Sequence, residues 1–379
     1  MARAARTDTI RAHNRALVLE EVRLRGPVTR VDIRRRTGLT AAGVAGVVAR
    51  LVEEGFVREV GRTAGGRGQP ATLLDLDPEA GFTVGLHLDR DLISGTIVDL
   101  KGDARGTLRS TISLPTPDAA VDLLRETYRS LLAASRAAEG RMLGVGLVTV
   151  GPLDPEGGRV LGPPNFPGWS DVPLRDEVAR AIGVPVWLQN NATAAALGEA
   201  WYGAGRGARN LLYVYVGLGL GGGVLLNGRL HVGTGRNAGE VGHVPVRAGG
   251  RWRPLEDVVS LRALRAAFGD RAERLESATS DEIARHDDLQ AWLDNAAETL
   301  GAVLAGVDNV LDLDAIVIGG RLPADLAAAL VQKVGAVVSR FQMPNRPHAA
   351  RVVQGLVRDD VAALGAAALP LYDVFSSEP

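Results

Sequence analysis

A repeated alternation of strand and helix patterns after position 78 constrains the fold of this chain more than any other feature. The first strands are expected at 82–88, 92–100, 106–114 and 143–150, with a helix at 118–138. Part of this order recurs as a strand at 184–188, a helix after Asn191 and strands at 211–216, 222–226 and 315–318. Alternating units of this kind pack as layers of helices and sheets. The repeat predicts two α/β lobes with a cleft between them, and a final packed helix at 361–370.

The N-terminal residues follow a different pattern, of three short helices and two strands. The first helix is expected at 13–25, Thr29 and Asp32 form a capping box that starts the second, and Thr40 caps the third. The third helix has one apolar stripe, made of Val44, Val47, Val48, Leu51 and Val52. Strands are expected at 56–60 and 71–76. These elements predict a winged helix-turn-helix whose third helix enters the DNA major groove, with a small helical interaction domain as the alternative.

Charge is distributed unevenly along the chain. Residues 1–75 hold 14 Arg against 8 Asp and Glu, although the whole chain has a net charge of −1. A basic end on an acidic body indicates contact with a polyanion. An Arg-rich solvated surface is the alternative, because Lys occurs only at 101 and 333.

The third helix offers few groups that could recognise bases. Opposite its apolar stripe it carries alanines and glycines, with Arg50 as the one strong hydrogen-bonding side chain, so direct readout of the major groove should be poor. Arg67, next to Gly68, is expected to enter a narrow minor groove together with Arg62. Arginines of the second helix are expected to contact phosphates. The expected DNA-binding residues are Arg30, Arg34, Arg35, Thr40, Arg50, Arg62 and Arg67.

Composition excludes several classes of protein. The chain has no Cys, which rules out disulfides and thiolate metal sites. No apolar run is long enough to span a membrane, and no apolar stretch follows the basic N-terminus. A cytoplasmic globular protein without a membrane partner is therefore expected, and 379 residues suggest two or three domains.

Residues 187–199 form a polar corner between a strand and a helix. Gln189, Asn190 and Asn191 lie between the end of a buried strand and an Ala-rich helix. Such corners line ligand clefts in open α/β sheets. This corner is the predicted centre of a binding site.

Several motifs in fixed order resemble the ROK family of repressors and sugar kinases. They are 144–152 (GVGLVTVGP), 163–169 (PPNFPGW), the Asn190 turn, 216–223 (VGLGLGGG), 239–243 (GEVGH), 255–256 (LE) and 318–320 (IGG). The resemblance covers essentially the whole chain and matches the repressor branch, which carries a winged domain. It implies an α/β protein with an N-terminal winged helix-turn-helix, residues 1–77, followed by a two-lobed actin-like, sugar-kinase (ribonuclease H-like) body, residues 78–379.

The resemblance also shows what a kinase would need and this chain lacks. The first phosphate loop of the family, Asp-x-Gly-x-Thr, corresponds to 86–91, which has no glycine and carries Asp89 and Asp91 instead. Backbone amides could not approach a γ-phosphate closely there. The family's catalytic Asp is Asn191, whose amide cannot accept the proton of a sugar hydroxyl. The glycines of 217–223 remain, serving either a nucleotide or tight packing between lobes.

The same resemblance indicates a sugar pocket without a metal. The sugar-binding residues that it implies are Asn165, Asn190, Asn191, Glu240, His243 and Glu256. Glu256 has an alternative role as a carboxylate at a helix N-terminus. The family's zinc cysteines are absent from 244–254, and we expect this loop to be held by packing through Trp252.

We therefore expect a sugar-responsive DNA-binding transcriptional regulator of the repressor type, which binds operator DNA as a homodimer and needs no cofactor or metal. A ROK-type sugar kinase with weak ATP-dependent hexose phosphorylation is one alternative. A regulator controlled by a protein partner instead of a sugar is the other.

Overall fold

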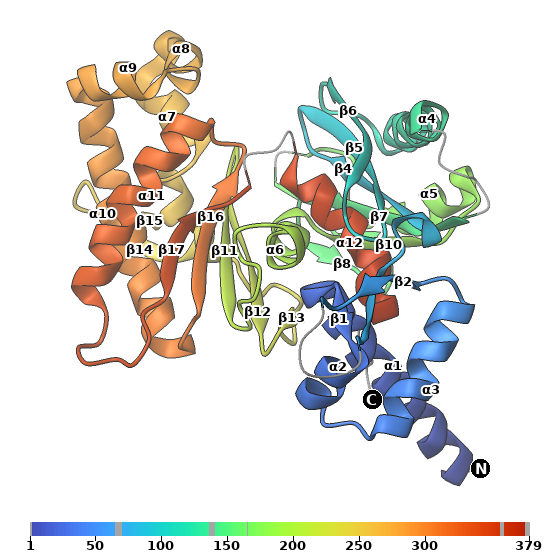
Figure 1. The fold of residues 1–379 in the computed structure, drawn as a ribbon. Coiled ribbons are helices and arrows are strands. Elements are labelled where there is room, and N and C mark those ends of the chain that lie inside the picture. The colour runs from blue at the N-terminus through green and yellow to red at the C-terminus, as the bar shows by residue number, and fades with distance from the viewer. Residues whose placement is uncertain (1, 65–69, 136–140, 165, 357–359, 376–379) are drawn as a thin grey trace.

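The computed structural model describes residues 2–64, 70–135, 141–164, 166–356 and 360–375. Two α/β lobes stand side by side, and a smaller N-terminal part lies below one of them (Figure 1). Each lobe is built on a five-stranded sheet, in the orders β10-β7-β4-β5-β6 and β13-β12-β11-β16-β17. In both sheets three antiparallel strands are followed by two parallel ones, so the lobes share one topology. This duplication is the physical basis of the repeated sequence pattern.

The first lobe contains apolar central strands covered by helices α4 and α5 (Figure 1). Every residue of β4 and β5 is buried, whereas the edge strand β6 is largely exposed. Its elements are β4 (Phe82–Leu88), β5 (Leu92–Asp99), β6 (Ala104–Thr111), α4 (Pro117–Ser135), β7 (Met142–Thr149), the short pair β8 (Leu153–Asp154) and β9 (Arg159–Val160), α5 (Leu174–Ile182) and β10 (Val186–Asn190).

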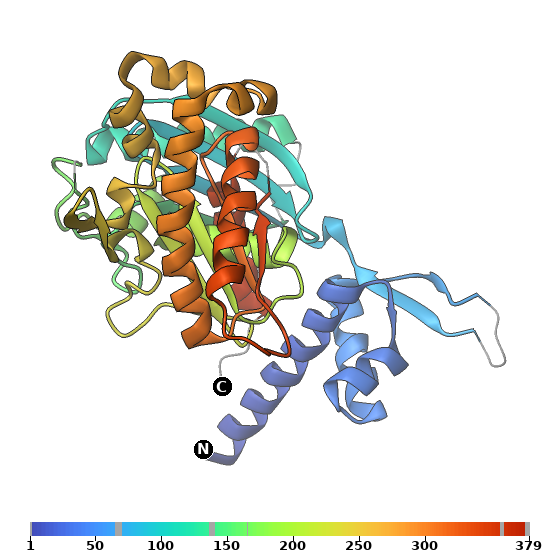
Figure 2. The ribbon, with the colours of Figure 1, turned by 90° about the vertical axis from the view of Figure 1, so that its left-hand side faces the viewer.

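In the second lobe two long helices, α10 and α11, pack side by side against the sheet (Figure 2). Its strands are β11 (Leu211–Val216), β12 (Leu220–Leu226), β13 (Arg229–His231), β14 (Pro245–Ala248), β15 (Arg251–Pro254), β16 (Ala315–Gly320) and β17 (Arg351–Gln354). Its α-helices are α7 (Leu261–Phe268), α8 (Ala272–Glu276), α9 (Ser280–Arg285), α10 (Asp287–Leu311) and α11 (Ala324–Phe341).

Two small-residue helices lie between the sheets, α6 (Asn191–Tyr202) and α12 (Val361–Phe375). They pack so closely that side chains are excluded at several contacts. A Cβ at Gly85 or Gly146 of the first sheet would lie 1.8 Å from a carbonyl oxygen of α12, and one at Gly365 would lie 1.9 Å from the Ala194 carbonyl of α6. The Ala- and Gly-rich sequences of both helices are therefore required by their position between the lobes.

The N-terminal part has the architecture of a winged helix. Its elements are α1 (Ala2–Arg25), β1 (Val28–Thr29), α2 (Arg30–Thr37), α3 (Ala41–Glu53), β2 (Val57–Arg62) and β3 (Thr72–Leu76). The predicted capping box is present, since the Thr29 hydroxyl accepts from the Asp32 backbone N–H and the Asp32 carboxylate accepts from Thr29. Thr40 caps α3 by accepting from the Gly43 N–H at 3.1 Å.

Several sequence predictions are corrected by the structure. Helix α1 begins near residue 2 instead of 13, and β1 joins the two predicted strands in a three-stranded sheet. Val52, predicted in the apolar stripe of α3, is 39% exposed, because the stripe turns away from the core at the end of the helix. The elements that were not predicted are helix α5 and strands β8, β9, β13, β14, β15 and β17, and β10 begins and ends two residues later than expected.

The winged part is packed against the helices between the lobes. The guanidinium carbon of Arg23 in α1 lies 4.2 Å from the ring centroid of Trp201 near the end of α6. Phe375 at the end of α12 also contacts Trp201, with ring centroids 5.7 Å apart. An ion pair joins Lys101 to Asp75 of β3 at 2.6 Å. Residues of α1, α6 and α12 consequently share one apolar core.

Candidate functional site

A cavity of about 390 Å³ lies between the two lobes. Asn190 and Asn191 line it from the first lobe, and Glu240, His243 and Glu256 line it from the second. These are five of the six residues expected to bind sugar, brought together from three separate stretches of sequence. The sixth, Asn165, lies outside the described residues, although its neighbour Pro164 lines the cavity.

Asn190 is at once the last residue of β10 and the N-cap of α6. Its Oδ1 accepts from the backbone N–H groups of Ala192 at 2.8 Å and Thr193 at 3.3 Å. The cap commits the amide oxygen to the helix, so the group that Asn190 presents to the cavity is its Nδ2 donor. A Cβ at Gly151 would lie 3.3 Å from this Nδ2 and 4.0 Å from Oε1 of Glu240, so glycine keeps the space between a donor and an acceptor open.

Asn191 begins α6 with a buried side chain. Its Oδ1 accepts from the Ala192 N–H at 2.8 Å, and only 7% of the residue is exposed. An amide at this position can orient a hydroxyl by hydrogen bonding, but it cannot remove a proton from it.

Glu240 and His243 form an acidic and basic pair on the second lobe. The His243 Nε2 lies 3.9 Å from the Glu240 Oε2, at the two ends of a short turn. Burial raises the pKa of the Glu240 carboxyl above its usual value; the charge of His243 opposes the rise and that of Glu256 adds to it. The pair can accept from and donate to neighbouring hydroxyls.

Glu256 braces the turn between β11 and β12. Its Oε2 accepts from the Leu220 N–H at 3.4 Å, and its Oε1 accepts from Arg262 at 3.0 Å. A Cβ at Gly219 would lie 2.7 Å from the same carboxylate. The following helix, α7, is capped by Ser260, which accepts from the Ala263 N–H. Glu256 therefore lies one turn before that helix and does not cap it.

The glycines of 217–223 allow close packing. A Cβ at Gly222 would lie 2.6 Å from the Gly239 carbonyl oxygen, and one at Gly223 would lie 2.6 Å from the Ala192 carbonyl oxygen of α6. Gly221, Gly222 and Gly223 are part of β12 and pair with β11. The packing explanation of these glycines, one of the two alternatives, is thus directly visible at Gly222 and Gly223.

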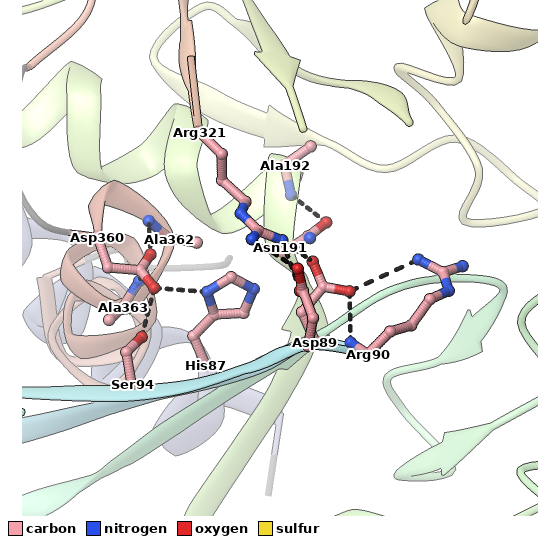
Figure 3. A network of polar contacts seen from close by, with 11 residues as sticks. His87, Asp89, Arg90, Ser94, Asn191, Ala192, Arg321, Asp360, Ala362 and Ala363 are labelled. Atoms are coloured by element: carbon pink, nitrogen blue, oxygen red, sulfur yellow. Dashed lines mark hydrogen bonds and ion pairs between the residues drawn. The ribbon is translucent and has the colours of Figure 1, made fainter. Parts of the chain in front are cut away.

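The turn expected to replace the phosphate loop is occupied by an arginine of the other lobe. Arg321, directly after β16, donates to the Asp91 carboxylate through Nη1 at 2.7 Å and Nη2 at 2.9 Å, and Nη1 also reaches Asp89 at 3.4 Å. Figure 3 shows Arg321 pointing toward Asp89, with Asn191 beside them. Burial alone would raise the pKa of Asp91, but Arg321 outweighs this effect and lowers it.

A second buried network anchors the start of α12 (Figure 3). The Asp360 carboxylate accepts from the N–H groups of Ala362 and Ala363, and from the Ser94 hydroxyl. The His87 Nδ1 lies 2.7 Å from the same carboxylate. Burial raises the pKa of Asp360, but His87 and the hydrogen bonds outweigh it and hold the pKa at about 2. Burial lowers the pKa of His87, yet the charge of Asp360 raises it above its usual value.

The loop without zinc cysteines forms the hairpin β14–β15. Trp252 is 71% exposed, so the expectation that it packs this loop in place is wrong. Backbone pairing of the two strands and the buried Val246 hold the hairpin instead. Among the described residues no group of three or more His, Cys, Asp or Glu side chains is arranged to hold a metal ion.

The expected DNA-binding residues are mostly on the surface of the winged part. Arg34, Arg50 and Arg62 are exposed. Arg30 is partly buried and lies 3.4 Å from Glu59, while Arg35 pairs with Asp32. The exposed residues of α3 are alanines, Gly46 and Arg50, as the sequence indicated, with Val52 and Glu53 at its end. Arg67 lies outside the described residues, and Thr40 is exposed but uses its hydroxyl to cap α3.

Some cavity and network residues were not predicted. Arg90, Arg262 and Arg265 line the cavity, and Arg321 and Asp360 complete the polar networks beside it. A signal did exist for Arg321, because it follows a predicted parallel strand at its carboxyl end, where ligand sites collect.

The duplicated lobes and the cavity between them define a two-lobed protein of the sugar-kinase fold class, with three helices and a three-stranded sheet at its N-terminus. A model described as the ROK family matches residues 83–372, and the chain belongs to this family. The xylose repressor of Caldicellulosiruptor bescii is 26% identical over 389 residues, covering 96% of each chain. The glucokinase of Thermotoga maritima is 30% identical over 271 residues, covering 65% of this chain and 84% of the glucokinase.

Solved structures agree with this assignment. A ROK family transcriptional regulator, homologous to the Escherichia coli MLC protein, superposes with a TM-score of 0.76 over 97% of this chain and 98% of that one, at 21% identity, which establishes the shared fold. A ROK family glucokinase from Streptomyces griseus, in complex with glucose and AMPPNP, gives a TM-score of 0.63 at 26% identity over 76% of this chain and 99% of that one. No helix in the described part of this chain is both long and apolar enough to cross a membrane.

Proposed function

We propose that this chain is a sugar-responsive transcriptional repressor of carbohydrate-utilisation genes that lacks kinase activity. One observation carries the proposal: the cavity lies at one end of α6, and the winged part is packed at the other. Asn190 caps the helix inside the cavity, and Trp201 near its end lies under Arg23 of α1. Twelve residues of helix span about 18 Å, so α6 is a rigid connection between the two.

The cavity is suited to a polyhydroxylated ligand. Asn190 offers a donor, Glu240 an acceptor and His243 either. Because these groups come from both lobes, a sugar held by all of them favours a particular spacing of the lobes. A ligand shifts such an equilibrium only by its difference in affinity for the two arrangements. The lobes are joined through α6 and α12, which both contact the winged part, so a change of spacing reaches the DNA-binding surface.

Two features argue against phosphoryl transfer. Where the family has its catalytic Asp, this chain has Asn191, whose amide cannot act as a base. Arg321 occupies the turn that corresponds to the family's phosphate loop. The alternative, a weak sugar kinase, is supported by the glucokinase relative and by the retained glycines. ATP-dependent phosphorylation of a hexose above a blank without protein would establish that alternative.

For DNA binding we propose residues 1–77 as the contact unit, with Arg34 and Arg35 on phosphates and Arg62 and Arg67 in the minor groove. A homodimer would place two such units on a two-fold operator. Light scattering of the protein in solution tests whether it is a dimer.

Each phosphate contact contributes about one to the slope of log affinity against log salt. Arg34→Ala should lower this slope by about one for an operator selected from random DNA, whereas Arg129→Ala, on the exposed surface of α4, should leave it unchanged.

Calorimetry with a panel of monosaccharides tests the sugar pocket. D-xylose and D-glucose are the first probes, because relatives are named for them. Glu240→Gln should weaken binding at least about tenfold by removing a charged acceptor, while Glu273→Gln, exposed on α8, should have no effect. Absence of heat with every sugar, together with intact operator binding, would contradict the sugar-gated function and favour control by a protein partner.

A further inference from the structure

The Arg321 ion pair joins the two lobes across the cavity region. Arg321 belongs to the second lobe, directly after β16, and Asp89 and Asp91 form the turn between β4 and β5 of the first (Figure 3). The Asp91 contact is bidentate, with both oxygens engaged. The side chains of Arg321 and Asp89 are 14% and 4% exposed and that of Asp91 is 35% exposed, so the guanidinium is largely shielded from solvent and salt.

A second ion pair between the lobes provides a natural comparison. Arg236 of the second lobe contacts Glu156 of the first, but the Glu156 side chain is 75% exposed. Exposed pairs of this kind contribute little to stability, whereas bidentate pairs of Arg with a carboxylate are strong and fix geometry. Of these two connections, the Arg321 pair is therefore the one able to determine the spacing of the lobes.

The turn carries two carboxylates at the place that corresponds to the family's phosphate loop. Arg321 donates to both of them, and Arg90 of the same turn lies 3.5 Å from Asp89. A nucleotide phosphate would be repelled by the carboxylates and would have to displace a buried, doubly bonded arginine. Arg321 thus supplies from within the chain a charged connection between the lobes at the turn that corresponds to the family's phosphate loop.

We propose that Arg321 is a positioning residue that latches the two lobes together without a nucleotide and thereby sets the affinity of the cavity for its sugar. The proposal rests on the proposed function only for the identity of the ligand. Arg321 does not line the cavity, but Asp89 and Asn191 do. The latch keeps Asn190 of the first lobe near Glu240 and His243 of the second, within a narrow range of lobe spacings. A sugar that favours one spacing within this range then has less motion to restrict, which lowers the cost of ordering.

The lack of native Cys allows the latch to be tested by distance measurement. Spin labels at Arg129→Cys on α4 and Ala284→Cys on α9, both exposed, report the separation of the lobes. In the otherwise unchanged protein we expect one narrow distance distribution that ATP does not alter. Arg321→Met should shift the distribution to longer distances and broaden it, while the matched variant Arg236→Met should leave it unchanged.

Sugar affinity is measured on the same variants with D-xylose and D-glucose. Arg321→Met should weaken binding about tenfold, because losing about 1.5 kcal/mol of contact between the lobes shifts their equilibrium by that factor away from the spacing that binds sugar. Arg236→Met should weaken it less than about twofold. If Arg321→Met does not fold, the lobe distance and the sugar affinity can be measured on Asp91→Asn. This substitution is milder, because the Asp91 side chain is 35% exposed and keeps its size.

An unchanged distance distribution in the Arg321 and Asp91 variants would overturn the latch. A lengthened distance with unchanged sugar affinity would overturn its role in positioning the pocket. If neither sugar binds the starting protein, the proposed ligand class fails, and the distance measurement still decides whether the latch exists.

Discussion

Replacement of Arg23 by Met should loosen the contact between the winged part and the rest of the molecule. The Arg23 guanidinium carbon lies 4.2 Å from the Trp201 ring centroid, and the Arg23 and Trp201 side chains are almost completely buried. Met keeps the apolar stem and removes the charge. A desolvated cation–π contact contributes between about 1 and 2 kcal/mol, so the equilibrium between docked and undocked winged part should shift about five- to thirtyfold.

Hydrogen exchange of the full chain measures this shift, since amides of α1 that face α12 exchange faster when the winged part detaches. Arg15→Met is the matched control: Arg15 is also on α1, and its guanidinium carbon lies 5.1 Å from the ring centroid of Phe56, within the winged part itself. It should destabilise the winged part without releasing it. Equal protection in Arg23→Met and the unchanged protein would refute the proposed connection through Trp201.

Three further predictions follow from the polar networks and the tight packing. Asn191→Asp should restore a carboxylate without restoring phosphorylation, because the phosphate position stays filled; ADP release with any hexose above the blank would contradict this. The pKa of His87 is higher in the folded protein than in the unfolded chain, so the ion pair with Asp360 stabilises the fold fully below pH 6.5. This stabilisation is lost as the pH rises through the folded pKa of His87. Asp360 stays charged throughout, because its own pKa is low. Stability measured by urea unfolding should fall between pH 6 and pH 8 in the unchanged protein, and should fall less in His87→Asn. Gly223→Ala should destabilise the fold by about 1–3 kcal/mol, because the new Cβ would meet the backbone of α6. Gly46→Ala in α3 should stabilise it by about 0.5–1 kcal/mol, because the new Cβ would meet nothing there. Similar urea midpoints for the two variants would argue against the packing explanation.

The parts of the fold that sequence predicts well are those buried on both faces. Strands 82–88 and 211–216 match their predicted limits, because continuous apolar runs leave little freedom in their boundaries. The edge strand β6 was predicted at 106–114 and lies at 104–111, since its side chains are largely exposed and carry a weak pattern. The prediction for Trp252 was wrong for a different reason. Its large apolar side chain suggested a buried residue, but it is exposed on the β14–β15 hairpin.

The grouping of Asn190, Asn191, Glu240 and His243 around one cavity could be predicted because these residues belong to local motifs. The contact between Arg321 and Asp91 could not, because the two residues are separated by 230 positions and no periodicity links them. Sequence did indicate that Asp89 and Asp91 exclude a phosphate. It could not show that a cation from the other lobe already neutralises them, since that depends on how the duplicated lobes face each other.

The most direct test of sugar-gated repression is the operator affinity of the full chain with and without saturating sugar. Fluorescence anisotropy with a selected operator should show a change in Kd of at least about fivefold, within the usual range for allosteric coupling. Glu240→Gln should need at least about tenfold more sugar for the same change, and without sugar it should bind the operator as tightly as the unchanged protein. An operator Kd that no sugar alters, in a protein that binds both sugar and operator separately, would contradict the account.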